Sequence, residues 1–75
     1  MRKAFVLINT ALGSELEVLA ELKKIDGVVE AREVYGVYDV VAEVEAETEK
    51  TLKEIVFSRI RTLKHVRSTL TLTAT

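Results

Sequence analysis

The sequence contains no cysteine and no glutamine, and it has one asparagine, one methionine and one histidine among its 75 residues. Without cysteine, the chain has no disulfide bonds, thiolate metal sites, cysteine nucleophiles or redox motifs. A single histidine also excludes clusters of histidine ligands, so we expect no metal or other cofactor. The scarcity of amide side chains, together with 31% charged residues, resembles the composition of proteins from thermophiles.

Aromatic residues are also scarce, at 5%, although 48% of the chain is hydrophobic. The apolar content is therefore mostly valine, leucine, isoleucine and alanine, which suits sheet contacts and helix stripes. A chain of 75 residues forms one domain and buries only a modest core. Self-association is the natural additional source of stability.

The charges nearly balance, with 11 basic and 12 acidic residues and a net charge of −1. This balance gives no global attraction to nucleic acid or to an anionic membrane. No apolar run approaches the ~20 residues that span a bilayer, and the N-terminus leads into a short apolar run without a signal-cleavage site. We expect a cytoplasmic protein with no direct nucleic-acid partner and no membrane partner.

Four stretches have the patterns of strands. Residues 4–9 (AFVLIN) form an apolar run too short for a helix, which predicts a strand buried on both faces. Residues 28–35 predict a second strand. Residues 38–45 alternate in their later part, so one face belongs to the core and the other is partly wet. In residues 66–73, threonines alternate with serine and leucine, which is typical of a strand.

Two helices are expected between these strands. Ser14 and Glu17 match a capping box, which predicts a helix over residues 14–25 that ends at Gly27. Thr48 is placed to cap a second helix, with acidic residues in its first turn and basic residues at its end. The apolar stripe of this second helix consists of Leu52, Ile55, Val56, Ile60 and Leu63.

The predicted element order is therefore βαββαβ. Right-handed crossovers pack both helices on one face of a four-stranded antiparallel sheet, so the expected class is α+β with a ferredoxin-like fold. The other face is then uncovered, and it carries apolar groups from residues 4–8 and from Val41. Because large exposed apolar patches mark interfaces, we predict a dimer whose sheets pack face to face or strand to strand.

Few residues suggest catalysis. His65 lies at the expected end of the second helix, where a cation interacts favourably with the helix dipole, and we interpret it as structural. Four acidic residues are best explained as a solvated face and not as a catalytic cleft: Glu43, Glu45, Glu47 and Glu49. Four basic residues are best explained as a solvated helix face: Arg59, Arg61, Lys64 and Arg67.

The segment YGVYD at residues 35–39 is unusual for a strand. Gly36 lies where a hairpin needs a residue that tolerates positive φ, and Asp39 can accept hydrogen bonds from the connecting backbone. In a second interpretation, Gly36 leaves backbone N–H groups accessible and Asp39 offers a carboxylate, while Tyr35 and Tyr38 form walls for a small zwitterion. The residue types alone leave both interpretations open.

Four segments resemble a known family. They are the AFVLIN run, the GVVEA run at residues 27–31, the VYGVYD segment at residues 34–39, and the final STLTLT strand. The VYGVYD segment looks like the family's V-x-G-x-[YFW]-D hairpin and is the most specific of the four. Through these segments, nearly the whole chain resembles the effector-binding (RAM) domain of the Lrp/AsnC family of transcription regulators.

This resemblance implies a sandwich with the same element order, dimers joined through their sheets, and dimers assembled into octamers or similar rings. It also implies that small effectors, commonly amino acids, bind between neighbouring dimers near the hairpin and the last strand. In the hairpin, Gly36, Val37 and Tyr38 would supply backbone and wall contacts, and Asp39 would bind the effector's ammonium group or order the loop. In the last strand, the implied ligand-binding residues are Ser68, Thr69 and Thr71.

One departure from the family concerns the N-terminus. Full-length regulators of this family carry a helix-turn-helix domain, whereas Met1 stands directly before the first expected strand. We therefore expect residues 1–75 to form a single stand-alone domain. Regulation would then arise through mixed assembly with full-length Lrp/AsnC relatives, or the ligand would serve another purpose.

The preferred hypothesis is an amino-acid-sensing and oligomerisation module that is not an enzyme. A small dimeric α/β-barrel enzyme of the monooxygenase kind shares the topology, but it needs an enclosed cavity with a catalytic polar group. A purely structural assembly subunit is the third hypothesis, and only ligand binding separates it from the first.

Overall fold

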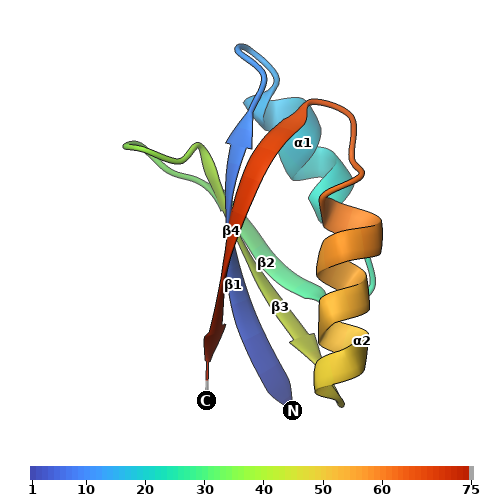
Figure 1. Ribbon diagram of the computed structural model, residues 1–75. Helices are drawn as coiled ribbons and strands as arrows, with labels where there is room; N and C mark the ends of the chain where they lie inside the picture. The colour runs from blue at the N-terminus through green and yellow to red at the C-terminus, as the bar shows by residue number, and fades with distance from the viewer. Residues whose placement is uncertain (75) are drawn as a thin grey trace.

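The structure is a computed structural model that describes residues 1–74. Along the chain the elements are β1 (Arg2–Thr10), α1 (Glu15–Leu22), β2 (Val28–Glu33), β3 (Val40–Ala46), α2 (Glu49–Glu54), η1 (Ile55–Ile60) and β4 (Val66–Ala74). The segment η1 is π-helical and continues α2 without a break, so the two together form the second helix (Figure 1). This order confirms the predicted βαββαβ arrangement.

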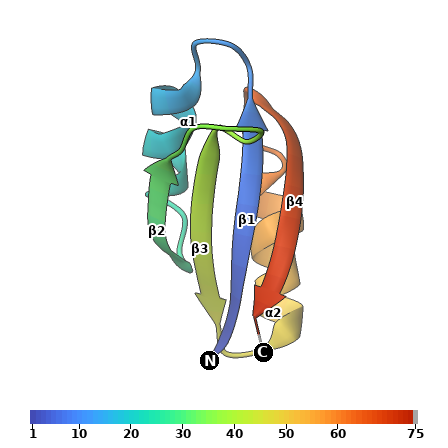
Figure 2. The same ribbon diagram turned by 90° about the vertical axis from the view of Figure 1, so that its left-hand side faces the viewer.

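The four strands form one antiparallel sheet in the order β2-β3-β1-β4. Figure 1 shows the helices on one side of this sheet, and Figure 2 looks onto the opposite, uncovered side. The predicted ferredoxin-like fold is therefore confirmed, with β1 and β3 at the centre and β2 and β4 at the edges.

The core lies between the sheet and the helix layer. Alternate residues of β1 and β3 are fully buried there, and they are Ala4, Val6, Ile8, Val40, Ala42 and Val44. From the helices, Leu52, Val56 and Ile60 of the predicted stripe are buried, and Ile55 and Leu63 pack against them partly exposed. Burying each large aliphatic side chain contributes about 1.5–3 kcal/mol, so this layer holds the fold together.

The second helix begins as predicted. Thr48 has extended backbone (φ −125°, ψ 156°), and its Oγ1 accepts a hydrogen bond from the Thr51 N–H at 3.1 Å. The hydroxyl thus satisfies one of the backbone donors that a helix leaves free at its first turn.

The predicted capping box of the first helix is wrong. Ser14 makes no side-chain hydrogen bond to the helix, because its backbone (φ −105°, ψ 10°) is not in the extended conformation that aims a capping hydroxyl at the first turn. Glu17, the expected partner in the box, instead pairs with His65, with 2.8 Å between Oε2 and Nε2. Helix α1 therefore starts without a side-chain cap.

The second helix also ends earlier than its apolar spacing indicated. The Arg61 N–H donates to the Val56 carbonyl at 2.9 Å, the wider hydrogen-bond spacing of a π-turn, and η1 ends at Ile60. His65 lies beyond this end, in the connection to β4, with left-handed backbone (φ 74°). Its expected place at the helix end is therefore wrong, and its side chain contacts Glu17 of α1.

Within residues 1–74, no helix is both long and apolar enough to cross a membrane.

Candidate effector site and assembly face

The connection between β2 and β3, residues 34–39, is a hairpin that projects from the sheet on the side away from the helices (Figure 1). Gly36 has a φ of +141°, which confirms the predicted need for glycine. Tyr35 and Val37 are 95% and 84% exposed, whereas Tyr38 is partly buried. The tip of the hairpin therefore presents its backbone, one aromatic side chain and one aliphatic side chain without cover from the rest of residues 1–74.

Asp39 ties the base of this hairpin to β1. Its N–H donates to the Ile8 carbonyl, and its carbonyl accepts from the Val34 N–H, each at 2.9 Å. Its Oδ2 accepts from the Thr10 N–H at 2.9 Å and more weakly from the Thr10 hydroxyl at 3.4 Å. The sequence predicted that the carboxylate bonds to the connecting backbone, but its acceptor bonds come from the end of β1.

The three predicted residues of β4 lie on two different faces of the sheet. Ser68 lies on the uncovered face opposite Asn9, and its Oγ accepts a hydrogen bond from the Asn9 amide at 3.1 Å. Thr69 and Thr71 point to the opposite face from Ser68, which is the face covered by the helices. There Thr71 lines a cavity of 190 Å³ beside the second helix. The structure thus brings Ser68, but neither threonine, to the hairpin's side of the sheet.

Asn9 lies beside the candidate site, and the sequence analysis did not single it out. The last paired residues of β1 and β3 are Ile8 and Val40, so Asn9 lies just past this pairing, between Ile8 and Thr10, the two residues of β1 that bond to Asp39. On its other side Asn9 pairs with Ser68, which gives a polar row across three segments at the hairpin end of the sheet. The available signal was that the only asparagine of the chain ends its apolar strand.

The uncovered sheet face is apolar in its centre. Five side chains from three strands form this bare face, and they are Phe5, Leu7, Val41, Leu70 and Leu72. Leu70 and Leu72 are 44% and 50% exposed, and Phe5 and Leu7 are only partly buried. The expectation that residues 4–9 are buried on both faces is therefore wrong for the single chain, because no element of residues 1–74 covers this side of the sheet.

Lys3 lies beside the bare face between two carboxylates. Its Nζ is 3.2 Å from Glu43 and 3.7 Å from Glu45. The hydrogen bond with Glu43, followed by the negative charges of Glu43 and Glu45, raises the pKa of Lys3 above its ordinary value of 10.5. These ion pairs lie at one end of the bare face, beside its apolar centre.

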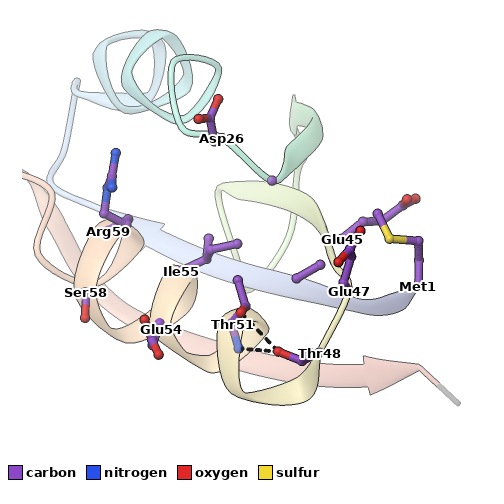
Figure 3. Close-up of a pocket in the computed structure, with 12 residues that line it drawn as sticks. Met1, Asp26, Glu45, Glu47, Thr48, Thr51, Glu54, Ile55, Ser58 and Arg59 are labelled. Carbon is purple, nitrogen blue, oxygen red and sulfur yellow. Dashed lines mark hydrogen bonds between the residues drawn. The ribbon is translucent and has the colours of Figure 1, made fainter.

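A separate groove of about 650 Å³ lies at the other end of β3, beside Ala46 and the start of α2 (Figure 3). Its walls include four carboxylates, of Asp26, Glu45, Glu47 and Glu54, together with the single guanidinium of Arg59. In Figure 3 these groups do not converge on one point, and the Thr48 hydroxyl is occupied with the helix cap. None of the predicted site residues lines this groove.

Comparison with known proteins identifies the family. Residues 3–75 match the sequence model of the Lrp/AsnC ligand binding domain. A hypothetical protein from Pyrococcus horikoshii, PHS023, is 39% identical, with 100% of this chain and 90% of that chain covered and a TM-score of 0.94. No curated protein matches the sequence.

Two solved regulators share this fold. E. coli AsnC is 26% identical, with 97% of this chain covered and a TM-score of 0.90, and this chain spans 50% of its length. The regulator NMB0573 from Neisseria meningitidis, solved in complex with L-Met, is 13% identical, with 99% and 49% covered and a TM-score of 0.86, which shows likeness of fold. With the family matched from residue 3 to residue 75, this chain belongs to the Lrp/AsnC ligand-binding domain family.

Proposed function

We propose that this chain is an effector-binding and oligomerisation module that senses a small amino acid and acts in transcription regulation or amino-acid metabolism. The observation that carries the proposal is the hairpin at residues 34–39, which projects from the sheet into solvent. The domain that carries this hairpin belongs to a family of ligand-binding domains. Its tip makes accessible the backbone groups that a small zwitterion needs, and its base is anchored to the sheet by Asp39.

The proposed site combines the hairpin with the polar row beside it. Gly36 and Val37 offer backbone contacts, Tyr38 offers a partly buried wall, and Ser68 supplies a hydroxyl from the same side of the sheet. Thr69 and Thr71 face the helix layer, so their part in binding stays a prediction. An amino acid as effector is supported by the fold that this chain shares with a regulator solved with L-Met.

The second part of the proposal is assembly with copies of the same chain. The bare face exposes leucines from an edge strand and partly exposes an aromatic side chain of the central strand, and a second sheet packed on it would remove them from water. The hairpin projects on this same side and so lies beside the proposed partner (Figures 1 and 2). We propose a cytoplasmic homodimer that assembles further, as an octamer or in mixed rings with full-length Lrp/AsnC relatives.

The proposal assigns the chain no catalytic activity. An enzyme of the monooxygenase kind needs a catalytic group in an enclosed cavity, whereas the partly exposed His65 pairs with the exposed Glu17 of α1. The groove beside α2 has carboxylates that do not converge. A purely structural assembly subunit is the remaining competitor, and it would form the same oligomer without binding an effector.

The test is calorimetric titration of the purified protein with each of the twenty amino acids, with the oligomer mass recorded by light scattering on the same samples. We expect saturable binding of one or a few amino acids. A Gly36→Ala variant should weaken that binding by about fivefold or more. The added Cβ introduces about 1 kcal/mol of backbone strain at the hairpin tip, where the amino acid is proposed to bind.

Gly13→Ala is the matched control for this variant. Gly13 also has positive φ (+82°), and at both glycines an added Cβ meets nothing within 4 Å. Both variants therefore place a Cβ at positive φ in open surroundings, but only Gly36 lies in the hairpin. Equal loss of affinity in both variants would contradict the assigned site, and a stable oligomer that binds no amino acid would favour the structural subunit.

A further inference from the structure

We propose that Asp39 is a positioning residue of the effector site: its carboxylate anchors the hairpin to the end of β1 and does not serve as the charge partner of the effector's ammonium group. This inference rests on the proposed function, and it deepens that function by separating the anchor of the site from its ligand contacts.

The first support is how fully Asp39 is bonded within the chain. Its backbone joins Ile8 on one side and Val34 on the other, and its Oδ2 accepts from the Thr10 N–H. Thr10 is only 7% exposed and lies just past the last pair of β1 and β3. A buried N–H in this position is costly to leave unpaired, so the carboxylate satisfies a donor that the fold itself creates.

The second support is that hydrogen bonds hold both chain neighbours of Thr10 in place. On one side the Asn9 amide bonds to Ser68, and on the other the Ala11 N–H donates to the His65 carbonyl at 2.8 Å. Between Asn9 and Thr10 the pairing of β1 with β4 shifts register. Such irregularities re-aim a strand locally and are common beside functional sites. The end of β1 is thus held by several hydrogen bonds that do not involve Asp39.

The third support is the contrast with the hairpin tip. Tyr35 and Val37 are almost fully exposed, and a Cβ on Gly36 would meet nothing within 4 Å. Because the tip has little packing of its own, the bonds at Asp39 and Val34 determine where it points. Loss of the carboxylate would therefore disturb the ligand edge even without any contact between Asp39 and the effector.

The two roles of Asp39 are separated by Asp39→Asn, because asparagine keeps an oxygen that accepts the Thr10 N–H but lacks the negative charge. Asp39→Ala removes both the acceptor and the charge. Glu33→Gln is the matched control, since it removes one exposed carboxylate at the end of β2, close to the hairpin in sequence.

We would measure amide hydrogen exchange at Thr10 and Val34 by NMR, and calorimetric binding of the twenty amino acids, for the native chain and all three variants. We expect the Asn variant and the Gln control to stay within about threefold of the native chain in both measurements. We expect the Ala variant to exchange about tenfold faster or more at these amides and to bind about tenfold more weakly.

Two results would overturn the inference. One is an Asn variant that loses as much affinity as the Ala variant while its amide exchange stays native, because that pattern identifies a charge contact with the effector. The other is an Ala variant whose exchange at Thr10 and Val34 is unchanged. If the native chain binds no amino acid, the proposed function fails, but the exchange rates still decide whether Asp39 anchors the hairpin.

Discussion

At the scale of single residues, Gly27 shows how one position serves two purposes. It has positive φ (+98°) in the turn between α1 and β2, and its carbonyl accepts the Glu45 N–H at 2.8 Å. A Cβ built there would lie 2.5 Å from Ile55 Cδ1 and 3.2 Å from the Glu45 carbonyl oxygen. The residue therefore permits both the turn and the close approach of the second helix to the sheet.

Gly27→Ala should lower the free energy of unfolding by about 2–4 kcal/mol, because it adds a steric clash to an unfavourable φ. Gly13→Ala should cost only about 1 kcal/mol, because its surroundings are open. Denaturant unfolding at one fixed protein concentration compares the two variants, since the proposed assembly would make stability depend on concentration. Equal losses in both would show that the clash with Ile55 is relieved without cost.

At the scale of elements, the two helix starts form a natural comparison. Thr48 caps the second helix and Ser14 does not cap the first, although both residue types favour caps. Their different backbone conformations explain the difference, since only extended backbone aims the hydroxyl at the free N–H groups of the first turn.

Thr48→Ala should therefore destabilise the fold by about 1 kcal/mol, whereas Ser14→Ala should change stability by less than about 0.5 kcal/mol. Thermal and denaturant unfolding of both variants measure this difference. A Ser14 variant that is destabilised as much as the Thr48 variant would mean that a capping bond does form at α1.

The pairing of β1 with β3 has a pH-dependent component at Lys3. Because bonding to Glu43 raises the pKa of Lys3 in the folded chain above 10.5, this pair stabilises the fold below that pH. The contribution is lost as the pH rises through the folded-state pKa. It is small, since the pair is exposed and surface ion pairs are weak.

We expect the melting temperature of the native chain to fall slightly more than that of Lys3→Gln as the pH is raised from about 9 to above 11. Differential scanning calorimetry across this range measures both slopes. Identical slopes would show that the Lys3 pairs contribute nothing to the stability of the folded chain.

At the scale of the whole molecule, the bare face is the surface through which we propose that copies of the chain assemble. The helices cover one side of the sheet, where the core lies. On the other side, apolar side chains of β1, β3 and β4 form one surface that no helix of residues 1–74 covers. For a small domain with a limited core, burying this face against a second copy adds stability that the single chain lacks.

Leu72→Glu should reduce the proposed oligomer to single chains at micromolar concentration, because it places a charge within the proposed dry contact. Leu16→Glu is the control, since Leu16 is also exposed (71%) but lies on α1, on the opposite side of the sheet. Analytical ultracentrifugation measures both masses. A native mass for the Leu72 variant, or dissociation in the Leu16 variant, would place the interface elsewhere.

Much of this fold could be predicted from local pattern. Alternation in residues 38–45 identified the buried face of β3, apolar spacing identified the buried side of the second helix, and the need for positive φ at Gly36 was correct. These features can be predicted because side-chain periodicity and the conformational freedom of glycine depend on neighbours in the chain.

Other features escaped prediction because they depend on contacts between distant segments. The acceptor role of Asp39 toward Thr10, and the pairing of Asn9 with Ser68, join residues 29 and 59 positions apart. The pairing of Glu17 with His65, and the π-turn at the end of the second helix, were likewise invisible in the pattern.

The amino-acid sequence by itself determined the element order, the core-facing stripes and the family to which this chain belongs, because each is written in local periodicity and short motifs. The tertiary structure alone decided which side of the sheet each set of β4 side chains joins at the hairpin end. Alternation along the strand separates Ser68 from Thr69 and Thr71, but only the register of β4 with β1 places Ser68 on the hairpin's side of the sheet and both threonines on the helix side.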